Sequence, residues 1–319
     1  MEVLSIVLPL LLILVAGYIS ARFNYLDKAL SSHLSTYFLR VSVPALLMTT
    51  VANEDLAAIL SVWKFFTVTL GIFVVLYALG FIYMFKKSKS LGESVFFAHS
   101  CVGVNAGMIV LPVMLRILGP ESMKYVTVAL LIVCLFIVPF TLILSEYFLA
   151  KEKEGSFFLC VKRAFIGTLK TPFILAIGVA FLFCFFHIPL PNFLHDAFSV
   201  LAMASISIAL FSVGMEVEFS ELKEGFKLIV FACVVKLLLF PFLALLAAWF
   251  FNFSDIESAA IVILSSAPTA KHLFAFCKQY KTFEKEGAAV VQVTTTLSIF
   301  TISGFLVFIN YFWPYVIVK

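Results

Sequence analysis

The sequence predicts an all-α integral membrane protein with ten transmembrane helices, and three observations lead to this fold class. Of the 319 residues, 63% are hydrophobic and only 13% are charged, whereas a soluble domain carries roughly 25% charged residues. The mean hydropathy is +1.13. The hydrophobic residues also form runs long enough to cross a bilayer, and basic residues gather in alternate connections between these runs.

Ten runs of about 20 residues are apolar enough to span the hydrocarbon core. The first lacks a preceding basic region and is followed by Arg22 and Lys28, so it is interpreted as a retained span rather than a signal peptide. The second and seventh are rich in Ser and Thr. The predicted spans are 3–21, 32–52, 63–85, 92–117, 123–149, 169–187, 194–215, 225–251, 257–277 and 286–316.

The basic residues predict how the spans are oriented. Of the 22 Lys and Arg residues, 15 lie in the connections that follow odd-numbered spans, and four lie on the opposite side. Cytoplasmic connections are enriched in Lys and Arg. We therefore expect a multi-pass protein of the cell membrane with both termini outside. The basic residues do not form one stripe, so nucleic acid is not an expected partner.

The longest connection divides the ten spans into two groups of five. The predicted organisation is a first five-helix repeat over 1–150, a cytoplasmic linker over 151–168 and a second repeat over 169–319. Because five is odd, the halves cross the membrane in opposite senses, which predicts inverted repeats. Transporters built this way bind substrate near the midplane, where interrupted helices of both halves meet.

The fourth and ninth spans contain helix-breaking residues at matching positions. The first spans of the two halves begin at 3 and 169, and this offset of 166 places Lys271 opposite Asn105. Glycine and proline loosen or block a helix, and the freed backbone groups are tolerated in a membrane where they line a cavity. The alternative is a simple kink. The candidate substrate-binding residues are Asn105, Gly107, Pro112, Pro268, Thr269 and Lys271.

Four of the polar side chains in these two spans have chemistry suited to transport. A charge at bilayer depth costs roughly 2.5–3.5 kcal/mol, so Lys271 is expected to meet a substrate carboxylate or to replace a bound Na⁺, rather than only to bond backbone carbonyls or snorkel. Asn105 offers two donors and one acceptor, with interhelical bonding as the alternative. His272 and His99 are the candidates for proton coupling, with a packing role as the alternative for each.

Other classes of site are not indicated by the residues. The six cysteines have no metal-ligand spacing, so neither a metal nor a cofactor is expected. Hydrolase and zinc-protease motifs are absent from the sequence, and no Asp or Glu lies in the middle of a predicted span. A membrane-embedded enzyme or a receptor is therefore kept only as an alternative of another class.

Short motifs along nearly the whole chain carry a family resemblance: Pro9–Gly17, Val41–Leu47, Asn105–Gly107, Leu111–Pro112, Lys236 with Pro241, Ala267–Ala270 and Thr295–Ser298. In this ordered set the chain resembles the auxin efflux carrier family, in particular its short bacterial-type members. The resemblance implies two inverted five-helix repeats with broken, crossing helices 4 and 9. It also implies a scaffold of spans 1, 2, 6 and 7 and a moving unit of the other six.

The resemblance further implies secondary active transport of a small organic anion, a carboxylate, by alternating access at the helix 4/9 crossing. The coupling ion would be a proton or Na⁺, and a homodimer through the scaffold would fit the family. A carrier like the bile-acid/sodium symporters shares this architecture and is the nearest alternative. Na⁺-dependent uptake would distinguish the two.

Overall fold

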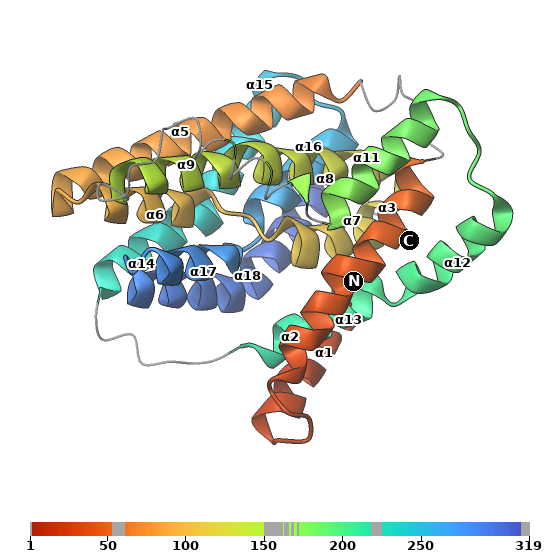
Figure 1. Ribbon diagram of the computed structural model, residues 1–319, viewed down its shortest axis with the longest axis horizontal. Coiled ribbons are helices and arrows are strands. Elements are labelled where there is room, and N and C mark those ends of the chain that lie inside the picture. The colour runs from red at the N-terminus through yellow and green to blue at the C-terminus, as the bar shows by residue number, and fades with distance from the viewer. Residues whose placement is uncertain are drawn as a thin grey trace.

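The computed structural model describes residues 2–52, 61–149, 162, 166, 169–170, 172–217 and 225–313. All regular secondary structure in these residues is helical (Figure 1). Two shorter apolar helices cover Leu8–Arg22 and Ile174–Phe185. Six stretches are long and apolar enough to cross a membrane: Trp63–Ser88, Leu91–Leu118, Pro120–Phe148, Asn192–Met215, Phe226–Phe250 and Glu284–Phe312.

The helices follow the predicted spans in order. In the first half they are α1 (Glu2–Arg22), α2 (Leu30–Tyr37), η1 (Phe38–Ser42), α3 (Val43–Val51), α5 (Trp63–Ser88), α6 (Leu91–Val102), η2 (Ala106–Val110), α7 (Leu111–Leu118), η3 (Pro120–Ser122), α8 (Met123–Leu131), η4 (Ile132–Ile137) and α9 (Val138–Leu149). In the second half they are α11 (Pro172–Phe185), α12 (Asn192–Met203), α13 (Ser205–Met215), α14 (Phe226–Val234), η5 (Val235–Leu239), α15 (Phe240–Phe250), α16 (Asp255–Ser266), α17 (His272–Gln279) and α18 (Glu284–Phe312).

Each predicted span overlaps one helix or a run of successive helices. The predicted spans 32–52 and 257–277 are helical, but they are not among the six long apolar stretches. The latter is interrupted between Ser266 and His272. The all-helical fold class is confirmed, whereas the count of ten spans and the inverted repeat stay predictions. The predicted linker, apart from residues 162 and 166, lies outside the described residues.

Four of the short segments, η1, η2, η4 and η5, are π-helical, and each ends two residues before a proline. The prolines are Pro44, Pro112, Pro139 and Pro241. In each case the N–H of the residue before the proline donates to the carbonyl five residues earlier. A proline ring clashes with the carbonyl four residues before it. A wider turn relieves that clash and keeps the helix continuous.

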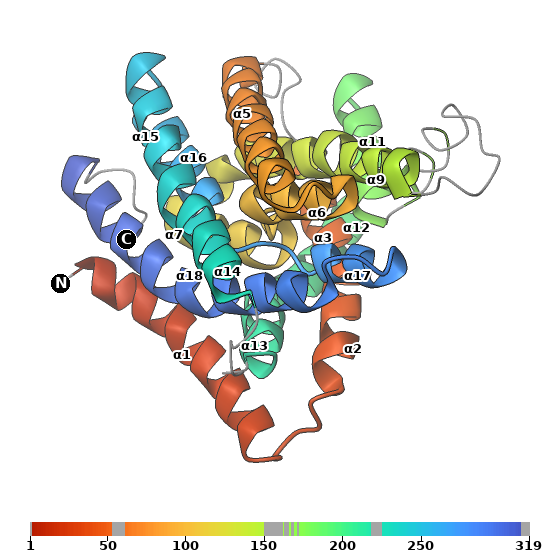
Figure 2. The same cartoon turned by 90° about the vertical axis from the view of Figure 1, so that its left-hand side faces the viewer.

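The helices pack in two groups (Figures 1 and 2). In the small helical group, which comprises α1–α3 and α11–α13, α1 packs along α13 and α3 packs against α11 and α12. A Cβ atom at Gly214 would lie 2.0 Å from the Leu14 carbonyl oxygen, and one at Gly17 would lie 2.1 Å from that of Phe211. These glycines therefore permit direct backbone contact between α1 and α13.

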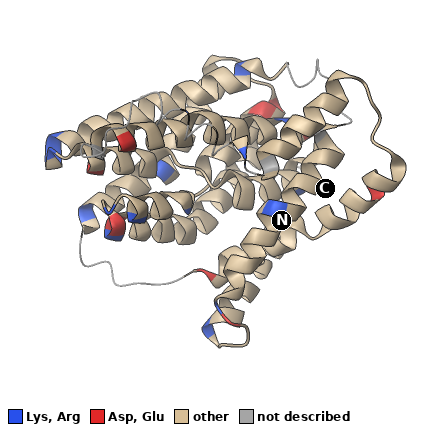
Figure 3. Cartoon of the chain, viewed as in Figure 1, with Lys and Arg blue, Asp and Glu red and all other residues tan. Residues whose placement is uncertain are grey.

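The large helical group comprises α5–α9 and α14–α18. Within it, α5 packs on α6, α15 on α16, and α17 and α16 on α18. Most charged residues lie near helix ends or in connections (Figure 3). Two pairs of helix ends are joined by hydrogen bonds: Lys64 Nζ donates to the Asn252 carbonyl at 3.1 Å, and the Tyr280 hydroxyl donates to Glu146 Oε1 at 2.6 Å.

Candidate functional site

Two helix interruptions meet inside the large helical group. Helix α6 ends at Val102 and the helix resumes at Ala106, while α16 ends at Ser266 and α17 begins at His272. The Asn105 N–H donates to the Pro268 carbonyl at 2.9 Å. A side-chain bond also joins the two segments, because Thr269 Oγ1 donates to the Ser100 carbonyl at 2.9 Å. Backbone groups freed by one break are thus partly satisfied by the other.

Asn105 shapes the first interruption and keeps a free donor. Its Oδ1 accepts a hydrogen bond from the Met108 N–H at 3.2 Å and so caps the N-terminal end of η2. Within the described part of the chain its amide nitrogen has no hydrogen-bond acceptor, and the residue is 8% exposed. The two N–H groups are therefore available to a ligand at the crossing.

The second interruption is anchored to α18. The Thr269 N–H donates to Thr294 Oγ1 at 3.2 Å, and this hydroxyl donates to the Val290 carbonyl at 2.7 Å. Nearby, the fully buried Lys236 donates from Nζ to the Ser265 carbonyl at 2.8 Å, close to the end of α16. Its Nζ atom also lies 4.6 Å from the centroid of the Phe240 ring. Lys236 therefore stabilises the carbonyl end of α16 and serves a structural role.

Lys271 does not bond the backbone carbonyls of the break, and it forms an ion pair with Glu216. Glu216 follows the last residue of α13, so this ion pair joins the large helical group to the small one. The two side chains are 37% and 25% exposed. Glu216 was not predicted as a site residue, because it lies one position beyond the predicted seventh span. Its position directly after that span was the sequence feature that could have indicated a role at the site.

The two candidate histidines are in direct contact. The Nε2 atoms of His99 and His272 are 2.9 Å apart, and His99 Nδ1 is 2.8 Å from Thr141 Oγ1 on α9. His99 is fully buried, and His272 is half-buried. Gly103 lies against the His99 ring, where an added Cβ would be 3.2 Å from Nε2. The glycine in the break therefore makes room for the imidazole.

Two predicted residues lie in the helical segments that follow the first interruption. Gly107 is inside η2, half-buried, and a Cβ there would be 3.3 Å from Leu39 Cδ2 of the small helical group. Pro112 is buried in α7, beyond η2. The structure thus brings together Asn105, Pro268 and Thr269, with Lys271 as the last residue of the second break and His272 directly after it. Within the described residues, no group of three His, Cys, Asp or Glu could hold a metal ion.

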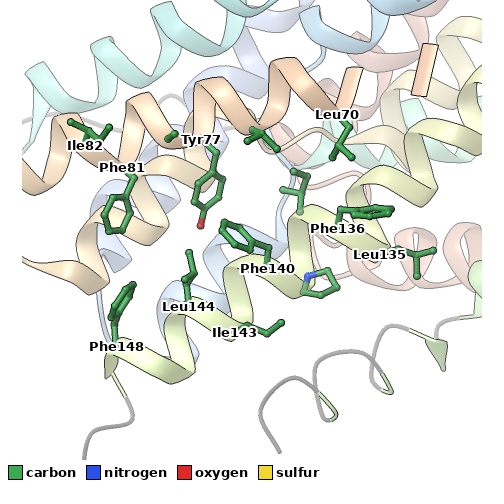
Figure 4. Close-up of a pocket in the computed structure, with 14 residues that line it drawn as sticks. Leu70, Tyr77, Phe81, Ile82, Leu135, Phe136, Phe140, Ile143, Leu144 and Phe148 are labelled. Atoms are coloured by element: carbon green, nitrogen blue, oxygen red, sulfur yellow. The ribbon is translucent and has the colours of Figure 1, made fainter. Parts of the chain in front are cut away.

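A concave region lies between α5 and α9, away from the helix interruptions (Figure 4). Its volume is about 660 Å³, and its lining is apolar except for Tyr77, whose ring points from α5 toward α9. Several of its lining residues, including Val74 and Phe140, are exposed on the surface. A charged ligand would lose its hydration there without a polar partner, so this cavity is not the candidate site.

Nearly the whole chain matches a known protein family. Residues 2–306 match the family described as "Membrane transport protein". The chain is 28% identical to a protein of Rhizobium meliloti named "Putative malonate transporter", over 97% of this chain and 96% of that one. It is 24% identical to an uncharacterised transporter of Methanocaldococcus jannaschii, over 94% of this chain and 96% of the other. The names of the family and of both relatives indicate membrane transporters rather than enzymes.

Proposed function

Because this chain belongs to the membrane transport protein family, we propose that it is a secondary active transporter of a small organic anion. The substrate class is a carboxylate, and the named relative directs attention to malonate. The anion binds where the two helix interruptions meet and is moved by alternating access. The observation that carries this proposal is the bond between Asn105 N–H and the Pro268 carbonyl, which joins both breaks at one point.

Three features of the crossing favour a carboxylate. The helical segment η2–α7 begins at Ala106 and α17 begins at His272, so two helix N-termini with partial positive charge start there. The free amide of Asn105 offers N–H donors. Lys271 supplies a full positive charge, held by an ion pair with Glu216. Because that pair is partly exposed, water screens it and a substrate carboxylate can replace Glu216.

The packing also supports the proposed architecture. In an inverted repeat, span 1 corresponds to span 6 and span 2 to span 7. Contact of α1 with α13 and of α3 with α11 fits such a two-fold relation. We propose that the small helical group is the scaffold and the large helical group is the moving unit. Both termini then face outside in the cell membrane, a homodimer forms through the scaffold, and a proton or Na⁺ drives the cycle.

The test is uptake of labelled malonate, with other small carboxylates as competitors, into liposomes that contain the purified protein. Gradients of protons and of Na⁺ are imposed separately and in both directions. We expect saturable uptake that Asn105→Asp abolishes. Aspartate keeps the oxygen that caps η2, but it removes the N–H donors and adds a negative charge that repels the anion.

A matched variant at another asparagine, Asn192→Asp at the start of α12, should leave uptake unchanged. If wild-type protein takes up none of the carboxylates under any gradient, the proposed function is wrong. Equal uptake by wild type and Asn105→Asp would show that the substrate does not bind at the crossing.

A further inference from the structure

His99 and His272 form a hydrogen-bonded pair, and its partners indicate which ring nitrogens carry a hydrogen. Thr141 Oγ1 donates to the Ile137 carbonyl at 2.9 Å, so its hydrogen is in use and it accepts from His99 Nδ1. The neutral His99 ring then has a lone pair at Nε2, which accepts the hydrogen on His272 Nε2. This network assigns the tautomer of both rings. It leaves the Nδ1 atom of His272, the half-buried ring, with an available lone pair.

From this geometry we propose that His99 and His272 together bind one proton, which is the ion that drives transport; the proposal rests on the function proposed above. A proton from water forms an N–H bond at Nδ1 of His272. The hydrogen at Nε2 of His272 can then move across the 2.9 Å contact to Nε2 of His99, so both rings share the positive charge. A second proton is excluded, because it would place two N–H groups face to face.

The distance between the rings is typical of a hydrogen bond and not of a shared metal ion. N–H···N contacts of this kind fall near 2.9 Å, whereas two imidazole nitrogens on a tetrahedral Zn²⁺ at about 2.1 Å would be roughly 3.4 Å apart. The ring of His99 is enclosed by α6, α9 and α17. The half-buried ring of His272 is the entry point for the proton.

Several ionisable groups lie on the helices packed against the pair, and few of them act on it. Tyr77 joins the pair through Thr141, with 3.2 Å between the two oxygens. Glu146 accepts from Tyr280, and Lys236 donates to Ser265. Among the described residues no carboxylate lies within hydrogen-bonding distance of either ring. The other ionisable groups on these helices are Lys64, Tyr83, Lys86 and Lys87 on α5, Glu93 and Cys101 on α6, Tyr147 on α9, Lys227 and Cys233 on α14, Cys277 and Lys278 on α17, and Glu284, Lys285, Glu286 and Tyr311 on α18.

This arrangement couples the proton to the anion. His272 is the first residue of α17, and the partial positive charge of that helix end disfavours the positive charge of the protonated pair. A carboxylate bound at the crossing supplies the compensating negative charge and so favours the protonated pair. Both histidines belong to the large helical group, so the proton moves with the substrate.

The experiment measures proton and malonate influx together in liposomes loaded with a pH-sensitive dye. We expect one proton per malonate for wild type, and no coupled proton for His99→Gln or for His272→Gln. Glutamine keeps hydrogen-bonding capacity but cannot hold a charge. Exchange of malonate for malonate at equal pH should persist in both variants. His33→Gln, at an exposed position on α2, is the matched control and should keep one proton per malonate.

An unchanged proton count in both variants, or a wild-type count of zero, would overturn the proposal. The two histidine substitutions are made separately, so the proton count of one variant can still be measured if the other variant fails to fold. If wild type moves no malonate, the proposed function fails, and the proton site is judged by ¹⁵N imidazole NMR titration. One protonation step shared by both rings supports the site, whereas no step or two independent steps would exclude it.

Discussion

Two polar links begin at the neighbouring residues Lys271 and His272 and differ in what they join. The link between His99 and His272 lies within the large helical group, is largely buried, and joins two imidazole rings. The link between Lys271 and Glu216 joins the large group to the small one, is partly exposed, and is ionic. A contact that persists through a movement can be buried, whereas one that breaks in each cycle is best placed where water and substrate compete for it.

The largest expected effect comes from fixing one group to the other. In a background without native cysteines, Leu14→Cys and Ser298→Cys place thiols on α1 and α18, at the same small cavity between the groups. A short bis-maleimide joining them should stop malonate uptake completely, because the groups can no longer shift. As a control, Glu146→Cys with Tyr280→Cys, joined within the large group, should still transport. Arrest by both cross-links would contradict the assignment of the moving unit.

The next effect concerns the cation of the exposed link. Lys271→Gln should raise the KM for malonate roughly tenfold to hundredfold, since hydrogen bonds to charged groups contribute about 1.5–3 kcal/mol. Uptake kinetics in liposomes measure this change. The matched control is Lys278→Gln, at an exposed position on the same helix, α17, and its KM should stay unchanged. A wild-type KM in Lys271→Gln would exclude Lys271 from malonate binding.

Removing the partner of that cation should act in the opposite direction. Glu216→Gln frees Lys271 from its ion pair, so the KM for malonate should fall roughly threefold, within the range of an exposed ion pair. Competition between Glu216 and the substrate carboxylate is the physical reason. If the ion pair served only to hold the structure, both Glu216→Gln and Lys271→Gln would raise the KM. The signs of the two changes therefore separate the alternatives.

The last effect concerns the buried link. Thr141→Val removes the acceptor that holds His99 in one tautomer, and the proton-driven rate should fall roughly threefold to tenfold, the worth of one hydrogen bond. Exchange at equal pH should be unaffected. Thr127→Val is the matched control, because the Thr127 hydroxyl is buried and has no hydrogen-bond partner in the described chain. An equal loss in both variants would indicate a general packing defect.

The sequence was sufficient to predict the all-helical class and to indicate which two helical stretches are interrupted. Runs of apolar residues predicted the helical stretches, because a bilayer requires about 20 such residues for each span. Gly103 and Pro268 lie in the two breaks, as their conformational properties lead one to expect. The resemblance to the auxin efflux carriers led to the same family that residues 2–306 match.

The partners of the site residues could not be predicted in this way. Contact between His99 and His272, and between Lys271 and Glu216, depends on how distant helices pack. Glu216 lies at the C-terminal end of α13, and nothing in the local sequence indicates its partner. Gly107 and Pro112 were grouped with the crossing by their helix-breaking character, but the structure has them inside η2 and α7.

The π turns before the four prolines also change how substitutions in these helices should be chosen. One extra residue in a turn rotates all the following side chains by about 100° around the helix axis. Ile229 and Ala248 are both buried, at 1% and 2% exposure, on either side of η5. An ideal α-helix would put these two positions roughly 100° apart, and absorbing one residue in η5 returns them to one face. A helical wheel drawn through Pro241 would therefore assign the wrong side of α15 to lipid.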